Sequence, residues 1–369
     1  MFLITNRNVH EKKTGPDALG SKPNPMGPNE LRLAEANKEG GKWRVSILPD
    51  TCTPTMLKSA GIKRQTDAQG NQQPVYASRY VAYKLLLQLR ALQKKRQGSP
   101  PALAFFVHGY NNDVEAVLDR AQTFEDLYGV EVVAFSWPAD GGGFRGTMSY
   151  LSDKRDALSS VGALDRAIIK LDDYLKEMNE ERRDRIETSA TAEHGDDAEE
   201  WDGHFTREMI RECPFTINLI LHSMGNYVFK NYMSSSTYSG NRLVFDNVIM
   251  AAADANNPGH PEWVDRIQCR KRVYITINEN DMALRASRMK AGEEQKARLG
   301  HWPYYLDSRR AVYVNFTGAR GVGDSHAYFE GKPVEKNPDV RQFFNLALNG
   351  DVAEDGLDYD IARNMYRIG

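Results

Sequence analysis

Cysteine is scarce in this chain of 369 residues. The three cysteines, Cys52, Cys213 and Cys269, are odd in number and lie far apart in the sequence. A disulfide framework needs paired cysteines, and a cysteine-type zinc site needs them closely spaced. We therefore expect neither feature in this protein.

Long apolar runs are also missing. No segment approaches the roughly 18 consecutive apolar residues that a membrane span requires. The first residues, Met1 to Arg7, lack the charged start and the longer apolar stretch of a secretory signal. We therefore expect a soluble, cytoplasmic protein with no membrane span.

Charge of one sign is not in excess either. Lys and Arg total 48, Asp and Glu total 50, and the formal net charge is -2. Nucleic-acid binding needs clustered basic residues, and the run 94–96 is too short to provide them. Nucleic acid is therefore excluded as the main partner.

What the sequence does contain, from Pro101 onward, is a regular alternation of apolar runs and helical segments. The apolar runs are continuous, as in strands that helices cover on both faces. With two earlier strands, at 2–5 and 43–48, the count reaches eight. The later predicted strands are 102–107, 130–135, 215–221, 244–250, 273–277 and 311–316, and the helices between them are 114–128, 153–182, 225–233, 261–267 and 282–291. The pattern predicts a mostly parallel eight-stranded sheet.

We interpret residues 1–369 as a single domain. Residues 1–100 supply N-terminal strands, loops and a helix, and 330–369 supply a C-terminal helix and tail. Residues 184–212 form a polar insertion, whose acidic part 186–202 we expect to be an exposed loop. A metal site could draw on His194, Asp196, Asp197 and His204, but their spacing is not diagnostic, so we expect no metal.

The strongest chemical signal is the segment 219–226, Leu-Ile-Leu-His-Ser-Met-Gly-Asn. A buried strand ends, Ser223 occupies the turn, and a helix begins at Gly225, which is the arrangement of a nucleophile elbow. Leu221 departs from the usual small residue two places before the serine. The arrangement predicts that Ser223 is a nucleophile, with His222 beside it.

A second signal is His108-Gly109-Tyr110-Asn111, at the end of the predicted strand 102–107. Acyl transfer needs backbone N–H groups that point at the developing oxyanion. In this arrangement one comes from the residue after the nucleophile, Met224, and the other from this loop, at Tyr110. We expect His108 to brace the loop.

The base and the acid follow from chain order. Of eight histidines, only His326 follows the last predicted strand, on a loop with three glycines, so we take it as the base. His10, His194 and His204 come too early, and His260 and His301 precede that strand. The acid is Asp281 or Asp254, each of which follows a strand; Asp281 is favoured because its position is the commoner one.

These motifs resemble those of a bacterial α/β-hydrolase family of unknown function. The shared features are Ile4-Thr5-Asn6-Arg7, His108-Gly109-Tyr110-Asn111, Ser136-Trp137-Pro138, His222-Ser223-Met224-Gly225, and Tyr150 and Asp153 with Ala157. The resemblance implies the α/β-hydrolase fold and serine-hydrolase chemistry. It names no substrate, because the family itself lacks one.

The sequence therefore predicts a serine hydrolase that cleaves carboxylic esters with Ser223, His326 and Asp281. His108, Asn111, Trp137, His222 and Asp254 are expected to line the site, and the chemistry requires no cofactor. The partner is a small-molecule or lipid ester. The alternatives are a lipase or phospholipase, covered by 141–148 and 301–305, and a non-catalytic binding protein with the same fold.

Overall fold

The computed structural model describes residues 1–64, 66–67, 69–96, 100–139, 146–211, 215–238, 240–289 and 296–369, with backbone alone for 146–151 and 210. In this part of the chain the main sheet has eleven strands. In spatial order they are β12 (Asp358–Asp360), β13 (Met365–Arg367), β11 (Ala311–Asn315), β10 (Arg272–Ile277), β9 (Asn247–Ala251), β8 (Thr216–His222), β6 (Ala102–Val107), β7 (Glu131–Ser136), β1 (Phe2–Thr5), β4 (Arg32–Glu39) and β5 (Lys42–Ile47).

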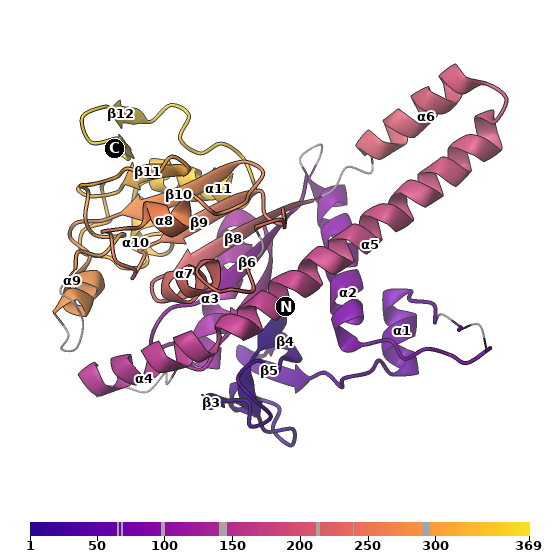
Figure 1. The fold of residues 1–369 in the computed structure, drawn as a ribbon, viewed down its shortest axis with the longest axis horizontal. Coiled ribbons are helices and arrows are strands. Elements are labelled where there is room, and N and C mark those ends of the chain that lie inside the picture. The colour runs from indigo at the N-terminus through magenta and orange to yellow at the C-terminus, as the bar shows by residue number, and fades with distance from the viewer. Residues whose placement is uncertain are drawn as a thin grey trace.

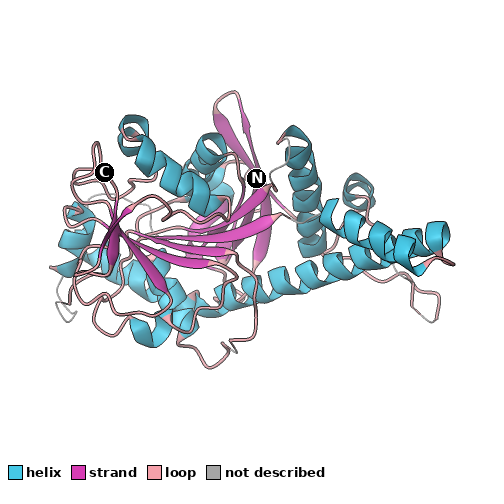
Figure 2. Cartoon of the chain, turned by 90° about the horizontal axis from the view of Figure 1, so that it is seen from above, coloured by secondary structure: helices cyan, strands magenta, loops and turns pink. Residues whose placement is uncertain are grey.

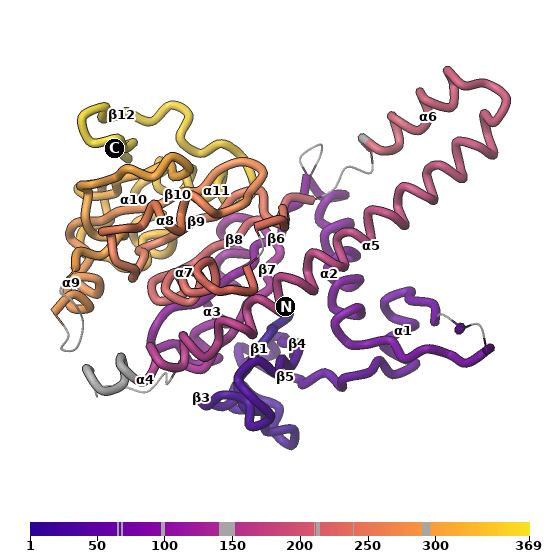
Figure 3. The backbone as a smooth tube through the Cα atoms, viewed as in Figure 1, coloured from indigo at the N-terminus to yellow at the C-terminus, as the bar shows by residue number. Residues whose placement is uncertain are grey.

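The strands from β13 through β1 pair in parallel, and only the outer pairs β12–β13, β1–β4 and β4–β5 are antiparallel. Figure 3 shows the first strand inside the sheet, whereas the C-terminal strands form one edge. The mostly parallel sheet was therefore predicted correctly, but its eight strands were too few. The prediction missed β4, whose residues are largely polar, and the three-residue strands β12 and β13, which turn the expected C-terminal tail into a sheet edge.

Side chains of the central strands are buried on both faces of the sheet. In β6, Phe105 and Val107 join one apolar core, whereas Ala104 and Phe106 join the other. Successive residues of a strand point to opposite faces, so a continuous apolar run indicates cover on both sides. Figure 2 shows this cover, with helices above and below the sheet.

The first core lies under α1 (Pro54–Ala60), α2 (Ala77–Lys95), α5 (Val161–His194), α7 (Gly225–Met233) and α8 (Pro261–Val264). The second lies under α3 (Val114–Tyr128), α9 (Met282–Arg288), α10 (Lys332–Lys336) and α11 (Pro338–Leu348). The remaining elements are the short helix η1 (Pro16–Ala18), α4 (Gly146–Ser159), α6 (Ala198–Arg211) and a separate hairpin of β2 (Arg7–Val9) and β3 (Leu19–Pro23).

The acidic segment 186–202 is helical, which corrects the predicted loop. Helix α5 continues to His194, and α6 begins at Ala198 and folds back along the outer half of α5 (Figure 1). Glutamate, alanine and arginine favour helix, so the many charges here are the solvated face of a hairpin rather than a sign of disorder. Ile186 and Ala190 of α5 are buried.

Candidate active site

The strand-to-helix turn after β8 holds Ser223 in a strained conformation. Ser223 has a φ of 53°, a left-handed conformation that is costly for a residue with a side chain. Gly225 then starts α7 against the end of β6, where a Cβ would lie 2.5 Å from the Val107 carbonyl oxygen. The larger Leu221, two places before the serine, is accommodated in the core, fully buried.

Asn226 fixes this turn from within. Its buried side-chain amide donates to the carbonyl oxygens of Leu221 and Ser223, both at 3.1 Å, and of Ala251 at 3.3 Å. The Ser223 N–H also donates to Ala251 at 3.0 Å. The strained turn is thus held by hydrogen bonds to β8 and β9, which is how such backbone geometry persists.

The loop after β6 lies directly against Ser223. A Cβ on Gly109 would be 2.7 Å from Ser223 Cβ and 3.3 Å from its Oγ, so only glycine permits this approach. Asn111 has a φ of 56°, and its N–H donates to Oδ2 of the buried Asp153 at 3.1 Å. The Asn112 side chain donates to the carbonyls of Gly109 and Tyr110. These bonds fix the loop that carries the predicted oxyanion donor Tyr110.

The second predicted donor is Met224, at the start of α7. No acceptor for its N–H lies among the residues that the structure describes. The first N–H groups of a helix have no partner within the helix, and the helix dipole adds positive potential at this end. The N–H of Met224 is therefore available to a negatively charged oxygen.

His108 and Trp137 form a buried support beneath the loop. Their rings stack at 5.0 Å between centroids, and Trp137 Nε1 donates to the His108 carbonyl at 2.9 Å. Burial, with a smaller contribution from the charge of Arg7, lowers the pKa of His108 to about 3. His108 is therefore neutral near pH 7 and is a much weaker base than an ordinary histidine.

Arg7 explains the N-terminal Ile-Thr-Asn-Arg motif. Its buried guanidinium donates to Ser136 Oγ at 2.9 Å, to the Asn112 carbonyl at 2.9 Å and to the Ala139 carbonyl at 3.2 Å. Asn112 lies after β6, Ser136 is the last residue of β7, and Ala139 lies after β7. Arg7 thus ties the start of the chain to the loops on the site side of the sheet.

His326 and Asp281 lie together after β11 and β10. The structure joins His326 Nδ1 to Asp281 Oδ2 at 2.7 Å, and Asp281 Oδ1 accepts from the Leu284 N–H at 3.0 Å. The Asp281 side chain is fully buried, whereas His326 is 25% exposed. The Asn278 amide donates to the carbonyls of Gly323 and Ser325, which fixes the glycine-bearing loop.

His222 connects the serine turn to His326. Arg120 Nη1 lies 3.4 Å from His222 Nδ1, and His222 Nε2 lies 3.1 Å from the His326 carbonyl oxygen. A guanidinium can only donate, so Nδ1 accepts and Nε2 carries the proton that it donates to that carbonyl. Burial, followed by the charge of His326, lowers the pKa of His222 well below its ordinary value, which favours this neutral form.

The Arg120 side chain is itself held in place. It forms a 2.9 Å ion pair with Glu330 and packs over the Phe329 ring. The chain Glu330–Arg120–His222 therefore ends on the backbone of His326. Sequence reasoning did not find Arg120 or Glu330, because no motif connects residues so far apart in the chain.

Asp254, the competing acid, has a different partner. Its carboxylate forms a 3.1 Å ion pair with Arg298 Nε and accepts from Ser287 Oγ at 2.6 Å. Both side chains of the ion pair are almost fully buried. The Asp254 N–H donates to the Ser223 carbonyl, so this residue adjoins the site through its backbone while its carboxylate is occupied.

No hydrogen bond joins Ser223 Oγ to His326 within the described ranges. Such bonds are often long in unliganded sites and tighten with substrate. Of the segments predicted as covers, 141–145 lie outside the described residues, whereas Tyr304 and Tyr305 are exposed at 43% and 78%.

One comparison with known proteins gives a match. Residues 88–180 match the family model described as "Alpha/beta hydrolase of unknown function (DUF900)". The fold is that of an α/β-hydrolase. The resemblance inferred from the motifs is confirmed, and the match supports hydrolase activity in general. No curated protein and no solved structure matches the chain.

The structure also bears on the predictions about membrane spans and cysteines. Within the part it describes, no helix has the length and apolar character needed to cross a bilayer. Cys52 and Cys269 are buried free thiols, and Cys213 lies outside the described residues.

Proposed function

We propose that this α/β-hydrolase cleaves carboxylic esters through an acyl-enzyme on Ser223. The observation that carries the proposal is the 2.7 Å bond from His326 Nδ1 to the buried Asp281, on a loop fixed to the residue beside Ser223. An ionised carboxylate accepts only, so Nδ1 holds the proton and Nε2 presents a lone pair. That tautomer is the one required of a general base.

The reaction proceeds in two halves. His326 Nε2 removes the proton from Ser223 Oγ as the oxygen attacks the ester carbonyl, and the N–H groups of Met224 and Tyr110 stabilise the oxyanion. The tetrahedral intermediate collapses, His326 returns the proton to the leaving alkoxide, and the alcohol departs. Water then attacks the acyl-enzyme by the same route, and releases the acid and Ser223. Asp281 orients His326 and stabilises its charged form.

The nucleophile is tested by labelling with a fluorophosphonate, which reacts with an activated serine. We expect a mass-spectrometric adduct on the peptide that contains Ser223, and no adduct there in Ser223→Ala. Ester turnover by that variant should fall by several orders of magnitude. An adduct on another serine, or full turnover by a folded Ser223→Ala protein, would contradict the assignment.

A panel of esters with graded acyl length separates the alternatives. Preference for short chains supports the esterase proposal, and preference for long chains supports a lipase or phospholipase. A folded protein that neither labels nor turns over any ester favours the non-catalytic binding protein.

A further inference from the structure

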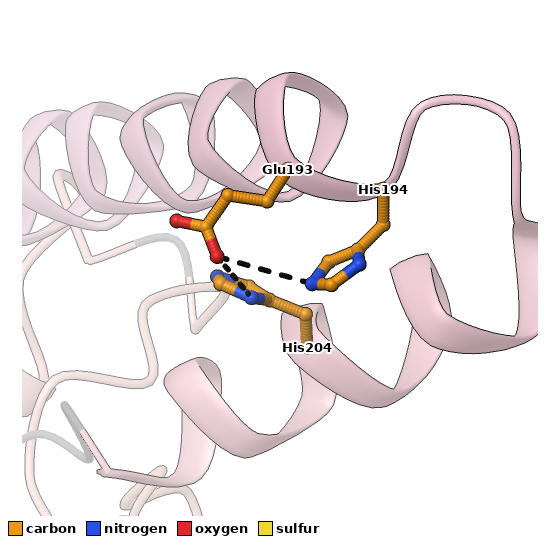
Figure 4. A group of neighbouring side chains, drawn as sticks. All are labelled: Glu193, His194 and His204. Carbon is orange, nitrogen blue, oxygen red and sulfur yellow. Dashed lines mark ion pairs between the residues drawn. The ribbon is translucent and has the colours of Figure 1, made fainter.

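A cluster of metal-binding side chains lies on the α5–α6 hairpin, well away from Ser223. Glu193 and His194 belong to the last turn of α5, and His204 lies on α6 facing them (Figure 4). Glu193 Oε2 is 3.8 Å from His194 Nε2 and 3.4 Å from His204 Nδ1. One ligand atom from each residue lies within 4.8 Å of the other two.

The hairpin is built so that these residues face one another. Trp201 Nε1 on α6 donates to Thr191 Oγ1 on α5 at 3.0 Å, and the Trp201 ring stacks on Phe205. The Asp197 carboxylate accepts from the N–H groups of Glu199 and Glu200, which starts α6. These contacts set the register of the two helices and bring His204 opposite the end of α5.

The carboxylate of Glu193 is also oriented. Ser189 Oγ lies 3.3 Å from Glu193 Oε1 and donates to it, whereas Oε2 faces both imidazoles. An outer hydrogen bond that holds a ligand in this way is typical of metal sites. Here it leaves one carboxylate oxygen directed at the space between the two rings.

The ligand types and distances fit one cation. Two imidazole nitrogens and a carboxylate oxygen are a zinc ligand set, and tetrahedral bonds of about 2.0–2.1 Å place ligand atoms about 3.3 Å apart. Two distances here, 3.4 and 3.8 Å, are close to that value. Glu193 and His194 are 58% and 29% exposed, so small side-chain rotations can bring the ligand atoms to that separation.

We propose that Glu193, His194 and His204 bind one zinc ion, with water as the fourth ligand on the exposed side. The ion links the end of α5 to the second turn of α6 and so fastens the hairpin. Of the four residues considered from the sequence, His194 and His204 are in this group, whereas Asp196 and Asp197 are not. The third member of the group is Glu193, which adjoins His194 in the sequence but was not considered as a ligand.

Zinc binding is tested on the metal-stripped full-length protein. Calorimetric titration with Zn²⁺ should give one site, and Co²⁺ in its place should give the intense visible absorption of tetrahedral coordination. His204→Ala and Glu193→Gln should each weaken Zn²⁺ binding by more than about tenfold, since each removes a ligand. Hydrogen exchange of residues 186–208 should slow when Zn²⁺ is added to the wild-type protein.

Asp196→Ala is the matched control, because Asp196 is an acidic residue of the same turn but not a ligand. It should bind Zn²⁺ as the wild-type protein does. The proposal is overturned if the wild-type protein binds no zinc, or if Asp196→Ala loses binding as strongly as His204→Ala. Because Ser223 plays no part, fluorophosphonate labelling should be the same in all these variants, so this test is independent of the proposed hydrolase activity.

Discussion

Two buried carboxylates follow neighbouring strands of the sheet, yet they are held in different ways. Asp281, after β10, accepts a hydrogen bond from the imidazole of His326. Asp254, after β9, is paired with the guanidinium of Arg298 and with Ser287. The two residues share burial and position relative to a strand, so the partner alone decides what each can do.

The partners differ in whether they can exchange a proton. A guanidinium stays charged at any pH that the protein meets, so the Asp254–Arg298 pair is a fixed structural ion pair. An imidazole gains and loses its proton near neutral pH, and a carboxylate beside it selects the tautomer and stabilises the charged form. The Asp254–Arg298 pair is therefore structural, whereas the proposed role of Asp281 is to prepare His326 as a base.

The largest effect we predict follows from replacing Asp281. Asp281→Asn keeps the size of the side chain but lets it donate to His326, which favours the wrong tautomer. Turnover of an ester substrate should fall by about four decades, as is typical when a triad carboxylate becomes an amide. The measurement is kcat in the purified variant, with circular dichroism to verify folding.

The matched control is Asp254→Asn, assayed well below its unfolding temperature. Its turnover should change far less than that of Asp281→Asn, because the Asp254 carboxylate is paired with Arg298 and Ser287, whereas that of Asp281 is paired with His326. The opposite ranking of the two variants would assign the acid to the strand end after β9.

The second effect concerns stability, and here we expect replacement of Asp254 to cost more than replacement of Asp281. Asp254→Asn removes the countercharge of Arg298, whose side chain is 3% exposed. Breaking a buried ion pair by removing one partner costs about 3–5 kcal/mol. Urea unfolding of Asp254→Asn should show a loss of this size, with a smaller loss for Asp281→Asn. Equal losses would mean that Arg298 finds another countercharge.

Sequence reasoning favoured Asp281 over Asp254 as the acid but could not predict which partner each carboxylate has. Chain order and strand ends place both residues at the same edge of the sheet, and the commoner position favoured Asp281. The deciding contact, Arg298 on Asp254, joins residues 44 positions apart, from a segment with no motif. The same limit applies to Arg120, which contacts His222 from 102 positions earlier in the chain.

Local patterns succeeded where one periodicity dominated. The predicted strand 102–107 and the helices 114–128 and 225–233 have the boundaries that the structure gives. They failed for 186–202, because a helix that packs against only one neighbour needs few apolar residues. There, low hydrophobicity was taken to indicate a loop, although the charged residues are good helix formers.

A third carboxylate extends the comparison of Asp281 with Asp254. It has neither an imidazole nor a guanidinium as its partner. Glu125 on α3 accepts from the Val132 N–H at 3.2 Å. Burial, with a smaller contribution from the charge of Glu131, raises the pKa of Glu125 from 4.5 to about 7. Burial outweighs the nearby N-terminal ammonium, which lowers this pKa, so the folded protein favours the neutral form of this side chain below about pH 7.

The smallest effect we predict is the dependence of stability on pH that follows. Between about pH 4.5 and 7 the unfolded chain releases the Glu125 proton while the folded chain keeps it, so the folded state binds more protons. The free energy of unfolding contributed by Glu125 must then fall as pH rises through this window. Glu125→Gln, which can still accept from Val132, removes that contribution.

Urea unfolding at about pH 5 and pH 8 should show a larger loss of stability in the wild-type protein than in Glu125→Gln. The same loss in both proteins would mean that Glu125 is ionised in the folded state across this range. A buried carboxylate at this position would then stay charged without an imidazole or guanidinium partner.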